Sequence, residues 1–146
     1  LEKVLLALQP VARTRGGQLR CVFGCGGDRD PIKRPLMAAV AEKHADQVVV
    51  TSDNPRSEDA QAIIDQVLAG LSRLEAAQVQ PDRARAIEQA IAQAQPGDVV
   101  LLAGKGHENY QEINGVKFDF SDRAHAQAAL DARAARPQDT TGVAPC

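Results

Sequence analysis

Apolar residues recur every three or four positions in five separate stretches of the chain, which is the spacing of amphipathic helices. The first stretch starts at Leu1 and is predicted to stop at Pro10, because proline lacks the N–H that a helix interior requires. Pro35 falls in the first turn of the second, where proline is tolerated. Ser57 stands before the third and predicts its N-cap. The fifth is predicted to end at about Ala135.

The same periodicity predicts which side chains of the helices face inward. In the second helix they are Leu36, Met37, Val40, Ala41 and His44. On this face His44 is interpreted as a core histidine rather than as a ligand. Asp82 predicts the N-cap of the fourth helix, which turns Ile87 and Ile91 inward.

Four short runs of mostly apolar residues predict buried strands between these helices. They are Leu19–Phe23, Gln47–Thr51, Ala77–Gln80 and Val99–Ala103. Asn114-Gly115, between two further extended segments, predicts a hairpin with a two-residue turn. Strands that alternate with helices predict an α/β fold, with a mostly parallel sheet flanked by helices and one antiparallel hairpin element.

Composition and charge exclude several classes of function. The 146 residues are 44% hydrophobic and 25% charged, with a net charge of −2, as in one soluble globular domain. Aromatic residues make up only 3%, and no basic block occurs, which argues against a nucleic-acid partner. No apolar run is long enough for a membrane span or a signal peptide. Three cysteines do not make a secreted disulfide framework, so we expect a cytoplasmic protein.

The two ends of the chain suggest a part of something longer. The first residue is Leu1 rather than methionine, so we expect a fragment. Residues 136–146 show no hydrophobic period and contain two prolines and a glycine, which predicts a tail or a linker. We therefore expect one domain over residues 1–135.

Polar loops follow three of the predicted strands. They cover residues 26–34, 52–56 and 104–108. Because the carboxyl ends of parallel strands lie along one edge of a sheet, we expect these loops to converge there. The segment 53–56 reads Asp-Asn-Pro-Arg and suits a ligand that carries both charges, such as an amino acid. The alternative is a surface turn marked by Asn-Pro.

Two common nucleotide-binding motifs fail on their decisive residues. In the segment 24–29, Arg29 occupies the place of the third glycine of a dinucleotide fingerprint. Gly104-Lys105 is followed by Gly106, where a P-loop needs Ser or Thr to hold magnesium. The backbone N–H groups of Gly24–Gly27 leave open a weaker contact with an anion or nucleotide.

No catalytic residue and no metal site are predicted. Cys25 lacks a partner base and is expected to be a buried structural thiol. Lys33 and Arg34 have a plain interpretation as a charged loop end, and Glu108 as a solvated carboxylate. His107 is the one histidine in a strand-end loop, with a loop-structural role as the alternative to a functional one.

Four motifs in chain order resemble the C-terminal domain of the Mur ligase family. They are Val22–Asp30, Lys33–Met37, Asp53–Arg56 and Ala103–Glu108. The resemblance covers residues 1 to about 135 and implies a Rossmann-like fold that delivers an incoming amino acid. It places ATP and magnesium on a central domain and the UDP-sugar on an N-terminal domain, so no cofactor is expected on this chain and the isolated chain is expected to be inactive.

The resemblance also implies the substrate and the residues that bind it. It is closest to the branch that adds meso-diaminopimelate to UDP-N-acetylmuramoyl-L-alanyl-D-glutamate in peptidoglycan synthesis. The binding residues it implies are Arg29, Asp53, Asn54, Pro55, Arg56, Gly104 and Glu108, with Lys33, Lys105 and His107 as secondary candidates. Lysine lacks the second carboxylate of diaminopimelate and would leave Arg56 desolvated and unpaired.

One departure and two alternatives accompany this interpretation. Pro31-Ile32 stands where relatives often carry a Lys-Gly pair, which affects the detail of that loop. The first alternative is a non-catalytic α/β module that binds a small anion or nucleotide through Gly24–Gly27. The second is a domain that serves only for interaction or linkage.

Overall fold

Four strands form a parallel sheet in the order β3-β2-β1-β4, in a computed structural model that describes residues 1–137. The strands are β1 (Leu19–Phe23), β2 (Gln47–Val50), β3 (Ala77–Val79) and β4 (Val99–Ala103), as predicted to within one residue at each end. In the register of the sheet, Cys21 of β1 lies between Val48 of β2 and Leu101 of β4. The strand order reverses between β1 and β4, which is where ligands bind in open α/β sheets.

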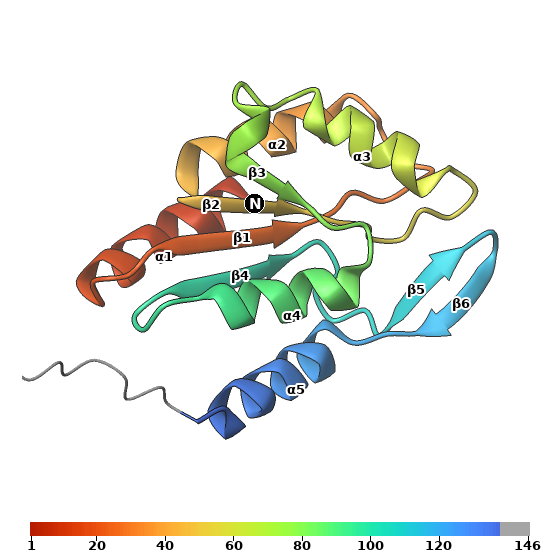
Figure 1. Cartoon of the computed structure of the whole chain (residues 1–146). Coiled ribbons are helices and arrows are strands. Elements are labelled where there is room, and N and C mark those ends of the chain that lie inside the picture. Colours follow the sequence, from red (N-terminus) through yellow and green to blue (C-terminus); the bar gives the residue numbers. More distant parts are fainter. Residues whose placement is uncertain (138–146) are drawn as a thin grey trace, which may run out of the picture.

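Helices cover both faces of this sheet (Figure 1). The helices α1 (Glu2–Thr14), α2 (Lys33–His44) and α3 (Ala60–Leu68) pack on one face. On the other face lies α4 (Arg83–Gln93), and α5 (Asp122–Ala135) packs on α4. A short 3-10 helix, Leu74–Ala76, leads into β3. The predicted α/β class with helices on both faces is confirmed.

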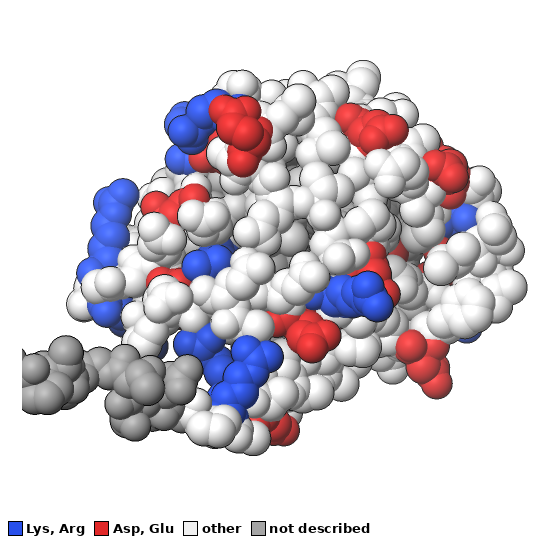
Figure 2. Space-filling model, viewed as in Figure 1, with Lys and Arg blue, Asp and Glu red and all other residues white. Residues whose placement is uncertain are grey.

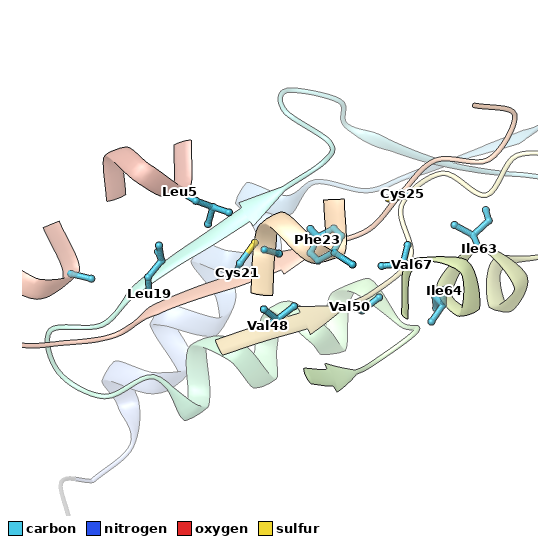
Figure 3. Packing of buried hydrophobic residues seen from close by; sticks show 13 residues of the cluster. Leu5, Leu19, Cys21, Phe23, Cys25, Val48, Val50, Ile63, Ile64 and Val67 are labelled. Atoms are coloured by element: carbon cyan, nitrogen blue, oxygen red, sulfur yellow. The ribbon is translucent and has the colours of Figure 1, made fainter. Parts of the chain in front are cut away.

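Alternation along the strands divides the core into two layers, and Figure 3 shows the larger of them. Cys21 and Phe23 point to the α1–α3 side, where they pack with Leu5 and Val67 in the larger cluster. Val22, between them in sequence, joins the smaller cluster under α4. Successive side chains of a strand point to opposite faces, so one five-residue strand supports both layers.

The predicted hairpin is a separate two-stranded antiparallel sheet of β5 (Tyr110–Ile113) and β6 (Val116–Asp119). Its turn residues Asn114 and Gly115 have φ values of 51° and 77°, the positive angles that a type I′ turn requires. A single parallel bridge between Arg56 and Ile113 connects the hairpin to the loop after β2. The hairpin therefore stands beside the carboxyl edge of the main sheet.

Three predicted details of the helices are wrong. The first helix does not stop at Pro10 but runs to Thr14. Pro10 lies on the exposed side, where water can take the carbonyl that loses its partner, while Leu5 and Ala12 are buried on the other side. Leu36, predicted to face inward, is 59% exposed.

The third wrong detail is the cap of α3. Asp59, not Ser57, is the N-cap, and its carboxylate accepts a hydrogen bond from the N–H of Ala62. The hydroxyl of Ser57 instead donates to Asp28 Oδ1 in the neighbouring loop. A contact across 29 residues has replaced the local one that the sequence suggested.

The surface of the described part carries both charges. On the face drawn in Figure 2, acidic and basic side chains alternate without a large patch of either sign. Within residues 1–137 no helix is both long and apolar enough to cross a bilayer. Helix α5 ends at Ala135 as predicted, and because residues 138–146 lie outside the described residues, the assignment of 136–146 as a tail or linker stays a prediction.

Candidate functional site

The three polar loops meet at the carboxyl edge of the sheet, as their positions predicted. A pocket of about 300 Å³ opens there, where the strand order reverses. Arg29 and Lys33 line it from the loop after β1 and the start of α2, Asp53 from the loop after β2, and Gly104 from the end of β4. Cys25 and Met37 supply its apolar part. Four of the ten residues proposed from the sequence thus surround one cavity.

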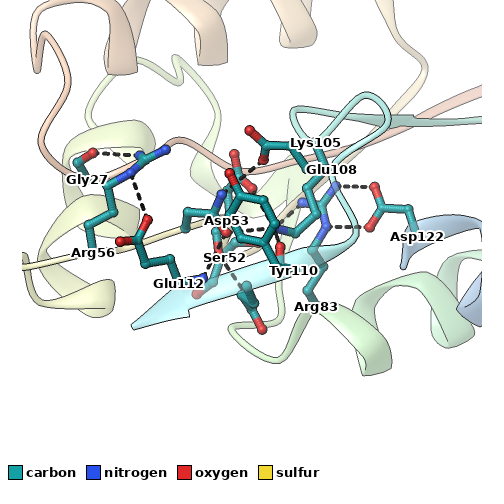
Figure 4. Close-up of polar contacts among 12 residues, drawn as sticks. Gly27, Ser52, Asp53, Arg56, Arg83, Lys105, Glu108, Tyr110, Glu112 and Asp122 are labelled. Atoms are coloured by element: carbon teal, nitrogen blue, oxygen red, sulfur yellow. Dashed lines mark hydrogen bonds and ion pairs between the residues drawn. The ribbon is translucent and has the colours of Figure 1, made fainter. Parts of the chain in front are cut away.

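Lys105 holds the loop after β2 from inside the protein (Figure 4). Its side chain is fully buried, and its ammonium donates to Asn54 Oδ1 at 2.8 Å and to the carbonyl of Tyr110 at 2.7 Å. Asp53 Oδ1 lies 3.1 Å from the same ammonium. These contacts give Lys105 a structural role, while a direct contact with a ligand stays a prediction.

The side-chain amide of Asn54 makes several further hydrogen bonds in the loop after β2. Its Nδ2 donates to Glu108 Oε2 at 3.0 Å, and its Oδ1 also accepts the N–H of Glu112 at 3.1 Å. Gln111 Nε2 donates to the carbonyl of Asp53 at 2.9 Å. The amide therefore joins the loops after β2 and β4 to the hairpin, and it orients the carboxylate of Glu108.

Arg56 is held by its neighbours on two sides. Its backbone has φ of 53°, which is uncommon for a residue with a side chain. The guanidinium donates from NH1 to the carbonyl of Gly27 at 2.8 Å, and Nε lies 3.5 Å from Glu112 Oε2 (Figure 4). Within residues 1–137, NH2 has no hydrogen-bond partner. The guanidinium is thus held in one orientation, and its pairing with a substrate carboxylate stays a prediction.

Two N–H groups at the end of the glycine loop after β1 donate within the protein. The N–H of Gly27 donates to the carbonyl of Asn54 at 2.8 Å, and the N–H of Asp28 donates to Glu58 Oε2 at 2.7 Å. A phosphate bound through these two N–H groups would have to replace both partners, one of which is itself an anion. Binding of an anion or nucleotide through the other N–H groups of Gly24–Gly27 stays a prediction.

Arg34 is buried, against its interpretation as a charged loop end. Its exposed fraction is 2%, and its guanidinium contacts Glu58, Gln66 and the carbonyl of Gly26. Hydrogen bonding to Glu58 raises the pKa of Arg34, and the same bond lowers the pKa of the Glu58 carboxyl. Both groups therefore stay charged throughout the neutral range.

A second buried arginine joins α4 to α5 beneath the site. Arg83 forms a two-pronged pair with Asp122, with Nε to Oδ1 and NH2 to Oδ2 both at 2.7 Å (Figure 4). It also donates to the carbonyls of Ser52 and Ala103, at the ends of β2 and β4. One side chain thus positions the carboxyl edge of the sheet relative to two helices.

The remaining candidates are one buried thiol and two exposed side chains. Cys25 is buried as predicted, with Sγ 3.6 Å from Met37 Sδ, and burial raises its pKa to about 11. His107 and Arg29 have exposed side chains, and the secondary role suggested for His107 stays a prediction. Among residues 1–137, no group of three His, Cys, Asp or Glu side chains could hold a metal ion. The arrangement is suited to binding a zwitterion by ion pairs.

Comparison with known proteins identifies the family. The model of the family described as "Mur ligase, glutamate ligase domain" matches residues 1–106, which is most of the chain. The chain belongs to the Mur ligase family. This confirms the resemblance drawn from the four sequence motifs.

Several relatives of this Mur ligase domain carry the name UDP-N-acetylmuramoyl-L-alanyl-D-glutamate–2,6-diaminopimelate ligase. The protein of Chromobacterium violaceum is 62% identical over 137 residues, which is 94% of this chain and 27% of the relative. That of Acidovorax sp. strain JS42 is 59% identical over 133 residues, which is 91% of this chain and 26% of the relative. A solved structure of a ligase with this name matches 90% of this chain and 28% of its own, with 45% identity and a TM-score of 0.77. The chain therefore spans about a quarter of the length of the relatives that it matches.

Several residues that shape the site of this Mur ligase domain were missed in the sequence. Glu112 pairs with Arg56, Glu58 with Arg34 and Asp122 with Arg83, and none was singled out for such a role. Each partner lies more than 20 residues away from its arginine in the chain.

Proposed function

We propose that this chain is the amino-acid-delivering domain of an ATP-dependent ligase that adds meso-diaminopimelate to UDP-N-acetylmuramoyl-L-alanyl-D-glutamate in cytoplasmic peptidoglycan synthesis. In such a reaction ATP phosphorylates the D-glutamate carboxylate. The amine of diaminopimelate then attacks the acyl phosphate, which forms the amide and releases phosphate. This domain contributes binding and placement of the amine, which is catalysis by proximity.

One observation carries the proposal. In a chain 62% identical to a named diaminopimelate ligase, the loops after β1, β2 and β4 surround one pocket at the reversal of strand order. Arg29 and Asp53 line that pocket with opposite charges. A substrate with separate ammonium and carboxylate groups matches such a lining better than an apolar or purely anionic ligand does.

Arg56 supplies the physical basis for selectivity. A guanidinium binds a carboxylate through two parallel hydrogen bonds, and its orientation by Gly27 and Glu112 lowers the entropic cost of doing so. We expect Glu108, whose carboxylate accepts a hydrogen bond from Asn54, to accept the ammonium group of the same end of the substrate. Lysine offers no second carboxylate, so its binding would desolvate Arg56 without compensation.

Neither ATP nor magnesium is assigned to this domain in the proposal. The glycine loop engages the N–H groups of Gly27 and Asp28 within the protein, and no group of three potential metal ligands occurs among residues 1–137. We assign ATP, magnesium and the UDP-linked dipeptide to other domains of a longer protein. The 146-residue chain alone is then expected to show no ligation, and ATP-dependent ligation by it would refute this assignment.

The test uses the full-length ligase that contains this domain. Arg56→Ala should lower kcat/KM for meso-diaminopimelate by about 10- to 100-fold, because a charge-assisted hydrogen bond contributes about 1.5–3 kcal/mol. The kcat/KM for lysine should change much less, so the ratio of kcat/KM for diaminopimelate to kcat/KM for lysine falls. Arg123→Ala, an exposed arginine of α5, is the matched control and should leave both unchanged. An unaltered ratio in Arg56→Ala would remove Arg56 from recognition.

A further inference from the structure

Arg34 contacts Gly26, eight residues before it, and Glu58 and Gln66, 24 and 32 residues after it. Its NH2 donates to the carbonyl of Gly26 at 3.0 Å and to Glu58 Oε2 at 2.5 Å. Its NH1 donates to Glu58 Oε1 at 3.1 Å and to Gln66 Oε1 at 2.8 Å. The first turn of α2 is thereby joined to the glycine loop, to the segment before α3 and to α3 itself. Four hydrogen bonds within the protein occupy both terminal nitrogens.

Two arginines hold consecutive carbonyls of the glycine loop. Arg34 binds the oxygen of Gly26, and Arg56 binds the oxygen of Gly27. The loop also packs closely, because a Cβ on Gly27 would collide with the carbonyl oxygen of Pro55. A displacement at Gly26 therefore cannot be absorbed by Gly27 without moving the loop that carries Arg56.

Glu58 also fixes the position of the loop after β1. Its Oε2 accepts both Arg34 NH2 and the N–H of Asp28. Asp28 in turn accepts the hydroxyl and the N–H of Ser57 through its two carboxylate oxygens. The carboxylates of Glu58 and Asp28 thus join the loop after β1 to the loop after β2. Arg34 holds the carboxylate of Glu58 in place.

We infer that Arg34 is a positioning residue for the amino-acid site, which sets the geometry of Arg29 and Arg56 through Gly26 and Glu58. The inference rests on the proposed function, and it adds a residue at the edge of the pocket whose two terminal nitrogens are already occupied by contacts within the protein. Arg29 follows Asp28 directly, one residue beyond the Gly27–Asp28 peptide whose N–H Glu58 accepts. Arg56 donates to the carbonyl of Gly27, and Arg34 donates to the carbonyl of Gly26, the residue before it. The charge of the pair persists at neutral pH, because the Arg34–Glu58 hydrogen bond raises the pKa of Arg34 and lowers that of Glu58.

Arg34→Lys in the full-length ligase tests this inference. Lysine keeps the positive charge, but a single ammonium cannot reach Gly26, Glu58 and Gln66 with the geometry of a planar guanidinium. We expect KM for meso-diaminopimelate to rise by about tenfold or more, since small displacements of binding groups reduce rates strongly. The preference for diaminopimelate over lysine should fall, and KM for ATP should not change.

The control is Arg20→Lys. Arg20 also forms an ion pair, with Asp98 at 3.0 Å, but at the opposite end of the sheet. Its replacement should lower the melting temperature without altering KM for diaminopimelate or the selectivity ratio. A role for Arg34 in stability alone would give the same pattern in Arg34→Lys, and that result would overturn the inference.

A second variant decides the case if Arg34→Lys does not fold. Glu58→Gln retains the shape of the side chain and removes its charge, and it should raise KM for diaminopimelate in the same direction. An unchanged KM in Glu58→Gln would count against the inference. If the unaltered full-length protein does not use diaminopimelate at all, the proposed function fails. If it does and both variants behave normally, only the role of Arg34 fails.

Discussion

The buried ammonium of Lys105 makes a quantitative prediction about stability. Its side chain is fully buried and contacts Asn54 Oδ1, the carbonyl of Tyr110 and the carboxylate of Asp53, whose own side chain is 11% exposed. Lys105→Met retains much of the volume but removes the charge and all three contacts. The carboxylate of Asp53 then stays buried without its partner, and the oxygen of Tyr110 loses this donor.

Removal of one partner from a buried ion pair typically destabilises a protein by about 3–5 kcal/mol. The free energy of unfolding of a domain this size is about 5–15 kcal/mol, so for a value near the middle of that range the variant should lose about a third to a half of its stability. Lys105→Met combined with Asp53→Asn removes the uncompensated charge as well. This double variant should recover about 1–3 kcal/mol relative to the single one, as expected for coupled neighbours.

Urea denaturation followed by far-ultraviolet circular dichroism measures these changes, because the chain has no tryptophan and one tyrosine. The matched control is Lys3→Met, on the exposed side of α1, which should change stability by about 0.5 kcal/mol or less. The reasoning is refuted if Lys105→Met destabilises the chain no more than Lys3→Met does, or if Asp53→Asn recovers nothing in the double variant.

Three further predictions concern the packing, the thiols and the acid range. Gly27→Ala should destabilise the chain and weaken diaminopimelate binding in the full-length enzyme, because its methyl group would displace the carbonyl of Pro55; unchanged melting and KM would contradict the close packing. Burial raises the pKa of Cys21 to about 12 and that of Cys25 to about 11, so peptide mapping after iodoacetamide treatment at pH 8 should find both unmodified in the native chain and modified in urea. Burial raises the pKa of Asp98, but hydrogen bonds from two backbone N–H groups and from Arg20 outweigh this effect and hold the pKa below its usual value. The ionised carboxylate therefore stabilises the folded chain above the unfolded pKa, and this stabilisation is lost as pH falls through the lower folded pKa. Asp98→Asn should therefore lose stability at pH 7 and show a flatter decline below about pH 4 than the parent chain.

Local patterns were sufficient for most of the fold because they act over short distances. The run Leu19–Phe23 and the pair Asn114-Gly115 each specify a backbone conformation through their own side chains, and both predictions are confirmed. Where a local signal failed, a distant contact had replaced it. Ser57 bonds to Asp28 instead of capping α3, and burial of Leu5 and Ala12 carries α1 past its proline.

The sequence alone determined the sheet, its alternating helices and the edge where the polar loops gather, because hydrophobic period and turn chemistry follow from neighbouring residues. It also indicated the family through four motifs, which the comparison confirms. Only the tertiary structure decided which charges are buried. Lys105 and Arg34 resemble any other loop cation in the sequence, and their partners Asn54 and Glu58 lie 51 and 24 residues away. The folded sheet brings these groups together, and only there can a cation lose water and still have its hydrogen bonds satisfied.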